Sequence, residues 1–517
     1  MIMRIISAAI RGMDVKRVEI EVNLVPASGQ EEKDEPKMIV VGLPDMAIRE
    51  SRERVWGALR SSAYRIPRGR SIVNLAPADL RKSGSAYDLP MAVGVLASDG
   101  QVACRSLNDT MIIGELAMSG QVRGIEGVLA VAMYAREHGM KRLLVPAENA
   151  REAALATGID VYGIATLRDA TEFLEGRRQL MPVTVNIESI YATETMTDTL
   201  DFIDVKGQES AKRAMMVAAA GNHNLLMIGS PGCGKSMIAK RLPGILPLLG
   251  VEEALEVTKI YSIAGLLDRR CGLMVRRPFR SPHHTVSDAG LVGGSVNPRP
   301  GELSLAHNGV LFLDELPEFK RNTLEVLRQP LETGEVVLAR ASGTFTFPAR
   351  VMLIAAMNPC PCGYYGHPRR RCRCTTAMIM AYRNRISGPL IDRVDMHVEL
   401  APLDSEILTQ KRQGEDSATI RGRVLMAREI QRKRYAGTSI RNNASLGGAL
   451  MDRYCVLDKE TVSMLQSIIA QLQLSARAYD RILRVARTLA DLDGLEKIEQ
   501  RHVWEAANYR ILDRQQW

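Results

Sequence analysis

Apolar and polar residues follow two different patterns along the first third of the chain, one typical of strands and one typical of helices. Short apolar runs, such as residues 38–41 and 71–75, predict buried strands. Residues 51–59, 89–97 and 128–138 instead predict helices. Because strand-like and helix-like segments follow one another here, residues 1–178 are expected to form an α+β domain of their own.

A different organisation begins after this domain. Between residues 179 and 199 the periodicity fades and polar, β-branched and proline residues dominate, which indicates a linker. Apolar runs at 225–228, 310–313 and 351–357 then predict buried strands, and the polar residues that follow them suit the ligand-facing edge of a parallel sheet. This second domain is expected to span residues 200–403.

Two further patterns complete the predicted architecture. Residues 334–348 contain two alternating runs around Ser342 and Gly343, which predicts a β-hairpin. Residues 404–517 predict a helical domain. Its helical spacing is clearest at Ile482, Leu483, Val485, Ala486 and Leu489.

Composition narrows the class of protein. The chain has 517 residues, of which 25% are charged and 46% hydrophobic, as in globular proteins of about three domains. No apolar run approaches the roughly 18 residues that a membrane span needs. The N-terminus reads as a strand rather than a signal peptide, and the eight cysteines do not resemble a secreted disulfide framework. We therefore expect a cytoplasmic protein without a membrane partner.

The net charge of +9 agrees with an anionic partner beyond a nucleotide, and equally with an ordinary solvated surface. Aromatic residues make up only 4% of the chain. A platform of stacked bases on aromatic rings is therefore not expected, and any contact with DNA should be mainly to the phosphate backbone.

One segment fits the phosphate-binding pattern G-x-x-x-x-G-K-[ST] at every fixed position, and an apolar strand precedes it while a helix-forming stretch follows. Its glycines allow backbone N–H groups to converge on phosphate oxygens. Lys235 would neutralise the β- and γ-phosphates of ATP, and the hydroxyl of Ser236 would bind Mg²⁺. The segment consists of Gly229, Ser230, Pro231, Gly232, Cys233, Gly234, Lys235 and Ser236.

Polar residues follow two of the predicted strands. Asp314 and Glu315 come directly after the strand at 310–313, and Asn358 follows the strand at 351–357. Asp314 is expected to hold Mg²⁺, Glu315 to orient or polarise the attacking water, and Asn358 to hydrogen-bond the γ-phosphate and that water.

Four cysteines lie within sixteen residues after this asparagine. Cys360, Cys362, Cys372 and Cys374 form two C-x-C pairs separated by nine residues, three of which are consecutive arginines. Four thiolates so arranged can bind Zn²⁺ tetrahedrally and fix the loop. C-x-C is less typical of zinc sites than C-x-x-C, so a reduced, metal-free cysteine loop is the alternative.

The order of phosphate loop, acidic strand, polar strand end and helical domain resembles that of AAA+ ATPases. Particular segments are similar to the magnesium-chelatase-related branch and, within it, to the ComM/YifB family, and the resemblance covers essentially the whole chain. The matching segments are Val41-Gly42-Leu43-Pro44-Asp45, Val73-Asn74-Leu75-Ala76-Pro77-Ala78-Asp79-Leu80, Arg280-Ser281-Pro282-His283-His284-Thr285 and Asn358-Pro359-Cys360-Pro361-Cys362-Gly363.

The resemblance implies an α/β fold with a P-loop AAA+ core (200–403) and a C-terminal helical lid (404–517). An α+β, Lon-protease-like (S5-like) domain (1–178) precedes them. It also implies roles for three residues: Asn358 as sensor 1, Arg393 as an arginine finger that reaches a neighbouring subunit, and Arg477 as sensor 2 on the lid. A guanidinium supplied in trans stabilises the transferring phosphoryl group and couples hydrolysis to assembly. Family members assemble as rings, most often of six subunits.

In the Lon-like family the nucleophilic serine lies where this chain has Ser85, but the position of the catalytic lysine holds Leu129. An apolar side chain cannot accept a proton, so the domain is expected to be proteolytically inactive.

By resemblance, the protein is expected to be an ATP-driven ring motor on DNA, with helicase or branch-migration activity in recombination or in the integration of transforming DNA. Two hairpins, one at 334–348 and one in the insertion around 285–305, would face the central channel. Arg340 is a candidate phosphate contact or, equally, an ordinary solvent-exposed arginine of the hairpin. The alternatives are a magnesium-chelatase-type motor subunit that remodels a metal-insertion partner and, disfavoured by Leu129, an ATP-dependent protease.

Overall fold

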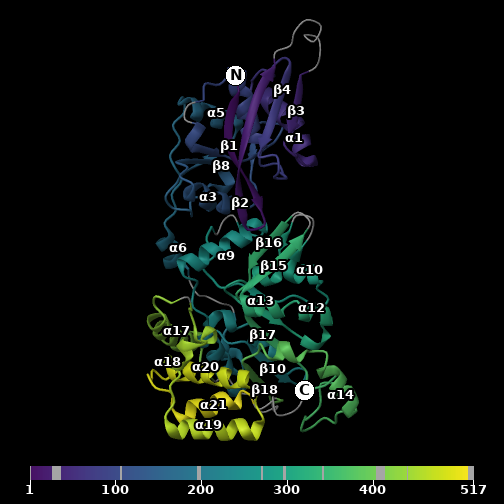
Figure 1. Ribbon diagram of the computed structural model, residues 1–517, viewed down its shortest axis with the longest axis vertical. Coiled ribbons are helices and arrows are strands. Elements are labelled where there is room, and N and C mark those ends of the chain that lie inside the picture. Colours follow the sequence, from purple (N-terminus) through teal and green to yellow (C-terminus); the bar gives the residue numbers. More distant parts are fainter. Residues whose placement is uncertain are drawn as a thin grey trace.

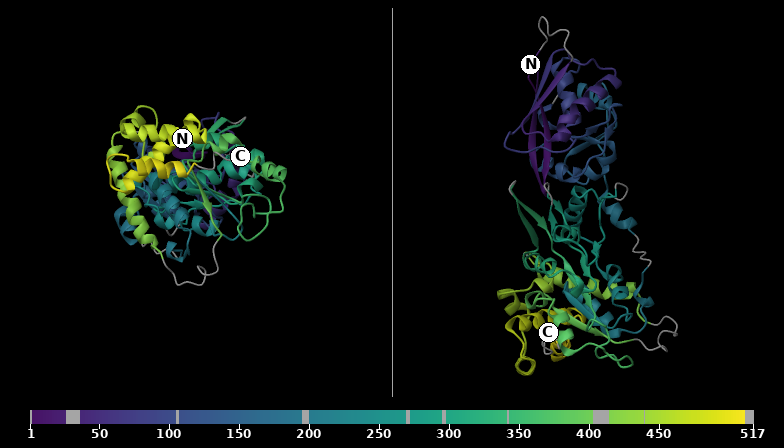
Figure 2. Two further views of the ribbon diagram at one scale, coloured as in Figure 1. Left: turned by 90° about the horizontal axis from the view of Figure 1, so that it is seen from below. Right: turned by 90° about the vertical axis from the view of Figure 1, so that its right-hand side faces the viewer.

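The computed structural model describes residues 2–25, 36–104, 107–194, 200–268, 272–294, 298–340, 343–402, 414–438 and 440–510. The molecule is elongated: an N-terminal α/β part, a central α/β part and a C-terminal helical part follow one another along its long axis (Figures 1 and 2). The predicted boundaries at 199–200 and 403–404, and the tip of the hairpin at 341–342, involve residues outside the described part. The exact domain limits stay a prediction.

The N-terminal part is built on a seven-stranded mixed sheet with the order β3-β4-β2-β1-β5-β8-β9. The pairs β1–β2 and β2–β4 are antiparallel, whereas the outer pairs are parallel. The strands are β1 (Met3–Arg11), β2 (Asp14–Val25), β3 (Lys37–Val41), β4 (Arg70–Ala76), β5 (Thr110–Ile112), β8 (Arg142–Pro146) and β9 (Asp160–Ile164). The helices are α1 (Met46–Ser61), α2 (Asp88–Ser98), α3 (Val128–Glu137), α4 (Ala150–Ala153) and α5 (Leu167–Glu175).

The predicted linker contains a helix that the sequence pattern did not indicate. Helix α6 (Ile187–Thr193) begins where the side chain of Asn186 accepts a hydrogen bond from the backbone N–H of Ser189. Half-buried Ile187, Ile190 and Tyr191 lie against the apolar cluster at the domain junction. With only seven residues and no fully buried side chain, the helix gives too short a pattern to recognise from sequence.

The central part contains a five-stranded sheet in which every pair is parallel, with the order β11-β14-β17-β10-β18. The buried, almost wholly apolar β10, β14 and β17 confirm the strands predicted from the apolar runs. The strands are β10 (Leu225–Gly229), β11 (Phe279–Arg280), β14 (Val310–Leu313), β17 (Met352–Met357) and β18 (Met396–Leu400). The main helices are α7 (Glu209–Gly221), α8 (Lys235–Ala239), α9 (Val251–Ile263), α12 (Arg321–Glu325), α13 (Arg328–Thr333), α14 (Thr376–Arg383) and α15 (Gly388–Ile391).

Two insertions leave this core toward the N-terminal part. Strands β15 (Glu335–Arg340) and β16 (Gly343–Pro348) form the antiparallel hairpin that the sequence predicted. The second hairpin, expected around 285–305, is reduced to a short strand pair flanked by helices. This second insertion forms helix α10 (Asp288–Val292), a pair of two-residue strands β12 (Gly293–Gly294) and β13 (Arg299–Pro300), and helix α11 (Glu302–Leu305).

The C-terminal part is helical, as predicted. Ile482, Leu483, Val485, Ala486 and Leu489 are all buried on α20, and they share one hydrophobic core with α7 and β10 of the central sheet domain. The lid is therefore packed onto the core. The helices are α17 (Ser417–Arg434), α18 (Ala449–Tyr454), α19 (Lys459–Leu472), α20 (Ala476–Leu492) and α21 (Gln500–Asn508).

The N-terminal and central parts meet through α3 and α9. Buried residues of both helices belong to one apolar cluster, and the backbone N–H of Gly127 donates to the carbonyl of Ser262 over 3.1 Å. An ion pair of 2.9 Å between Arg299 and Glu126 lies beside this contact. No helix among the described residues has the length and apolar character needed to cross a bilayer.

Candidate nucleotide-binding site

The phosphate-loop residues lie between β10 and α8, at the carboxyl edge of the parallel sheet. Gly232 and Gly234 have φ angles of 80° and 96°, in the left-handed region where a side chain would strain the backbone. Lys235 is buried, and its Nζ donates to the carbonyl of Gly229 over 2.6 Å and to that of Ser230 over 3.1 Å. The loop thus holds its ammonium group against its own backbone.

Asp314 and Asn358, which follow two other strands of the sheet, lie beside this loop. The hydroxyl of Ser236 donates to Oδ2 of Asp314 over 2.5 Å, just beyond the end of β14. Nζ of Lys235 lies 3.1 Å from Oδ1 of Asn358, the residue after β17. Burial lowers the pKa of Lys235, and the negative charge of Asp314 opposes this effect. One hydroxyl, one carboxylate, one amide and one ammonium therefore converge on one edge of the sheet.

A hydroxyl next to a carboxylate suits Mg²⁺, which prefers oxygen ligands. Ser236 and Asp314 are thus the residues that would hold the ion. Glu315 adopts the left-handed backbone conformation with a φ of 53°. Its carboxylate is exposed and takes no part in the hydrogen bond between Ser236 and Asp314. This position leaves the carboxylate open to a water molecule.

Sequence reasoning missed two contacts of this site. Nδ1 of His284 lies 3.5 Å from Oε2 of Glu315, and the His284 ring packs against His283 and Phe319. Gln208 donates to the carbonyls of Cys233 and Ala401, so that it joins the phosphate loop to the end of β18. The paired histidines of the matched segment at 280–285 were a signal for the first contact. The sequence carried no signal for the contacts of Gln208.

Arg393 and Arg477, the expected arginine finger and sensor 2, do not join the cluster around Lys235. Arg393, between α15 and β18, pairs with Glu332 over 2.7 Å and lies mostly buried. Arg477, at the start of α20, pairs with Asp392 over 3.1 Å. The lid arginine thus contacts the residue that precedes Arg393, and neither guanidinium is hydrogen-bonded to the phosphate loop among the described contacts.

The four cysteines of the C-x-C pairs come together. The Sγ atoms of Cys360 and Cys362 are 3.4 Å apart, and those of Cys360 and Cys372 are 3.7 Å apart. All four Sγ atoms, including that of Cys374, lie within 4.8 Å of one another. Four thiolates about 2.3 Å from a tetrahedral zinc ion would be about 3.8 Å apart. The sulfur positions therefore fit a zinc site.

The Lon-like serine has a carboxylate partner instead of a lysine. The hydroxyl of Ser85 is hydrogen-bonded to Glu115, and the Ser85 carbonyl accepts from the N–H of Asp88 in the turn before α2. Leu129 is fully buried on α3, within the cluster that joins the two domains. Leu129, which the resemblance places at the position of the catalytic lysine, is thus an apolar side chain of the domain junction.

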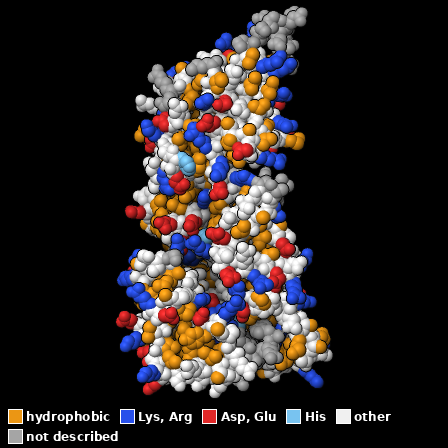
Figure 3. Space-filling view, viewed as in Figure 1, with side chains coloured by type: hydrophobic (Ala, Val, Ile, Leu, Met, Phe, Trp, Pro, Cys, Tyr) orange, Lys and Arg blue, Asp and Glu red, His pale blue; other side chains and the backbone are white. Residues whose placement is uncertain are grey.

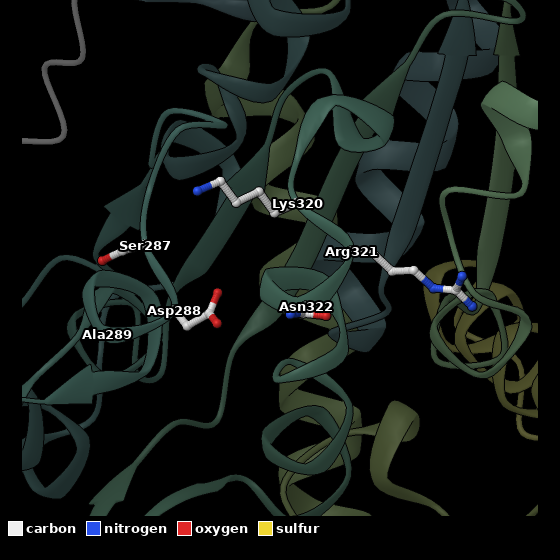
Figure 4. Close-up of a pocket in the computed structure, with 6 residues that line it drawn as sticks. All are labelled: Ser287, Asp288, Ala289, Lys320, Arg321 and Asn322. Carbon is white, nitrogen blue, oxygen red and sulfur yellow. The ribbon is translucent and has the colours of Figure 1, made fainter.

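A separate open cavity of about 570 Å³ lies between α10 and α12 (Figure 4). Asp288 and Asn322 point toward one another across it, whereas the side chain of Arg321 points away. None of its lining residues belongs to the phosphate loop or to the strand ends beside it. The residues with nucleotide chemistry lie elsewhere.

Three family models match the chain. The model of magnesium chelatase, subunit ChlI, matches residues 201–408, that of subunit ChlI of Mg-chelatase matches residues 30–149, and that of the ChlI C-terminal region matches residues 414–510. Together they cover parts of all three segments of the fold.

Individual relatives agree with these matches. The competence protein ComM of Haemophilus influenzae is 43% identical over 512 residues, which are 98% of this chain and 97% of the relative. The YifB protein of Salmonella typhimurium is 44% identical over 93% of this chain and 92% of its own. The 38 kDa magnesium-chelatase subunit of Cereibacter sphaeroides is 27% identical over 32% of this chain and 54% of its own.

Proposed function

Because the chain belongs to the ComM/YifB family of magnesium-chelatase-like AAA+ ATPases, we propose that it is a ring-forming motor that uses ATP hydrolysis to move on DNA. The work proposed is helicase activity or branch migration on recombination intermediates, including the integration of transforming DNA. The likeness to a competence protein along nearly the whole of both chains carries this proposal.

ATP and Mg²⁺ are the cofactors that the family implies. In the proposed mechanism the phosphate loop binds the triphosphate through its N–H groups, and Lys235 neutralises charge on the β- and γ-phosphates. Ser236 and Asp314 would hold Mg²⁺, which when bound would supply charge neutralisation at the phosphates. Glu315 accepts a proton from the attacking water, and Asn358 orients that water by hydrogen bonding.

Arg393 is proposed to act on the nucleotide of the neighbouring subunit. Within its own chain it pairs over 2.7 Å with Glu332, whose carboxylate is exposed. The contact between Arg477 and Asp392 supports communication between the lid and this segment. Each site would then be completed only in a ring, which we propose to contain six subunits.

Two arginines near the hairpin tip support contact with a polyanion. Arg340 is the last residue of β15. Its Nη2 atom lies near Gly294 of the second insertion: a Cβ added at Gly294 would be 3.4 Å from this nitrogen. Arg11, the last residue of β1, lies 5.2 Å from the centre of the Phe345 ring on β16. Both guanidinium groups are exposed, and among the described contacts neither pairs with a carboxylate.

The rest of the surface does not present one basic face in the view of Figure 3, where acidic and basic side chains are interspersed. DNA binding is therefore proposed to depend on the junction between the N-terminal part and the hairpin, to which Arg11 and Arg340 belong. Contacts there would be to phosphates rather than to bases.

We also propose that Cys360, Cys362, Cys372 and Cys374 bind one structural Zn²⁺ per chain. The fit of their sulfur positions to a tetrahedron supports this.

The proposed function is tested by ATPase rates with forked, four-way and duplex DNA. DNA should stimulate hydrolysis, and Arg340→Ala should weaken DNA binding and reduce the slope of log affinity against log salt by about 0.9, as expected for one lost phosphate contact. Arg432→Ala, which removes an exposed lid arginine paired with Glu429, is the matched control. Wild-type protein that neither binds DNA nor responds to it would refute the assignment.

A further inference from the structure

The cysteine loop starts at the nucleotide site. Asn358 is the residue of the nucleotide site that lies directly after β17. Cys360 follows two residues later, and its side chain is fully buried. Cys362 and the later pair, Cys372 and Cys374, close the loop back on Cys360. A metal ion bound by the four thiolates would therefore fix the backbone that begins at Asn358.

The same loop contacts the phosphate loop directly. Gly363, the residue after Cys362, has a φ of 81°, and its N–H donates to the carbonyl of Cys360 over 2.9 Å. A Cβ added at Gly363 would lie 2.4 Å from Cδ and 2.6 Å from Cγ of Pro231. Only a glycine lets the backbone of the cysteine loop lie so close to the proline of the phosphate loop.

The opposite side of the cysteine loop is held by α14. Nε of Arg383 donates to the carbonyl of Pro359 over 3.3 Å, and its guanidinium lies 5.5 Å from the centre of the Tyr365 ring. The loop is thus placed between a helix of the core and Pro231. A shift of the loop would be transmitted to the segment that binds phosphates.

From this arrangement we infer that metal binding by the four cysteines supports the phosphate loop through the contact of Gly363 with Pro231, so that metal occupancy sets the affinity for nucleotide. This inference rests on the proposed zinc site. It assigns to that site a role in nucleotide binding, beyond local stabilisation of the loop.

Two glycines of the loop provide a matched pair of variants. Gly363→Ala introduces a methyl group against Pro231 and leaves all four cysteines in place. Gly366 has a similar φ of 76°, but an added Cβ there would have no neighbour within 4 Å. Gly366→Ala therefore reproduces the backbone strain without the contact, and the difference between the variants isolates the contact.

The experiment measures zinc content by plasma emission spectrometry and the affinity for a fluorescent ATP analogue, on the full-length chain. We expect one zinc ion per chain in the wild type and in both glycine variants. Gly363→Ala should bind the analogue about tenfold more weakly, while Gly366→Ala should stay within about twofold of the wild type. Removal of zinc from the wild type by a chelator should weaken binding to a similar extent, and added Zn²⁺ should restore it.

The possible failures are distinguishable. Equal affinities of the two glycine variants, each with one zinc ion, would overturn the inference and leave the zinc site intact. Wild-type protein without zinc would overturn both the site and the inference. Loss of zinc from Gly363→Ala alone would contradict the assignment of the effect to the Pro231 contact. Thermal unfolding of each variant shows whether it is folded.

Discussion

Nζ of Lys235 lies 3.1 Å from Oδ1 of Asn358. The hydrogen bond joins the start of α8 to the end of β17 and brings the ammonium that is proposed to bind phosphate next to the amide that is proposed to orient the attacking water. Adjacent strands of one parallel sheet make this contact possible, because their carboxyl ends meet at one edge.

Lys235→Ala should abolish measurable nucleotide binding. The variant loses the buried ammonium that is proposed to face the phosphates, and no other described lysine replaces it in the hydrogen bond with Asn358. Binding of a fluorescent ATP analogue measures the effect. Lys240→Ala, which removes an exposed lysine at the end of the same helix, should bind normally. Retained affinity in Lys235→Ala would exclude the assigned role.

Glu315→Gln should bind ATP with near-normal affinity but hydrolyse it at least a hundredfold more slowly. The amide keeps the size of the side chain but cannot accept the proton of the attacking water. Glu318→Gln, three residues later and paired with Arg385, is the control. Binding and turnover are measured separately, and normal turnover of Glu315→Gln would contradict its role.

Much of the central fold could be predicted from the sequence. The continuous apolar runs at 225–228, 310–313 and 351–357 indicated buried strands, and the structure confirms them as β10, β14 and β17. Strand β18, with the sequence Met-His-Val-Glu-Leu, was not predicted. Its pattern includes a buried histidine and an exposed glutamate, and its partner β10 is distant in the sequence.

Contacts between distant loops could not be predicted at all. The approach of Gly363 to Pro231 depends on the position of α14 and on the closure of the cysteine loop. The pairing of His284 with Glu315 requires β11 to lie next to β14, which a two-residue strand does not reveal. Local patterns report which face of an element is buried. They do not report which element covers it.

Asp395→Asn should destabilise the fold by about 3 kcal/mol near neutral pH, as expected when a buried charge pair is broken. Asp395 accepts from the N–H of Asn224 over 3.0 Å and lies 3.6 Å from both His223 and Arg481, so it joins the core to the lid. Urea unfolding measures the difference. Asp452→Asn, which replaces an exposed lid carboxylate, should change stability by less than about 0.5 kcal/mol.

The effect of Asp395→Asn on stability should also depend on pH. Burial raises the pKa of Asp395, but His223 and Arg481 outweigh this effect and hold it below its ordinary value. A depressed pKa in the folded state stabilises the protein above the unfolded pKa, and this stabilisation is lost as the pH falls through the folded value. The stability difference between wild type and Asp395→Asn should therefore shrink below about pH 4. A difference that grows on acidification would contradict this account.

The N-terminal domain should show no proteolysis. Ser85 is hydrogen-bonded to Glu115, and Leu129, which the resemblance to the Lon-like family places at the position of the catalytic lysine, is buried in the domain junction. Purified protein with ATP is therefore expected to leave casein intact, as judged by release of labelled peptides. Cleavage that disappears in Ser85→Ala would show that the domain is an active protease.

The central claim is that neighbouring subunits complete each nucleotide site, and mixing two inactive variants tests it most directly. Arg393→Ala should bind ATP normally but lose turnover, whereas Lys235→Ala should not bind ATP at all. In mixed rings, an Arg393→Ala subunit with an intact phosphate loop can receive Arg393 from a Lys235→Ala neighbour. The account predicts ATPase activity in the mixture well above the sum of the two separate preparations. A mixture no more active than that sum, in assemblies shown by mass measurement to contain both variants, would contradict it.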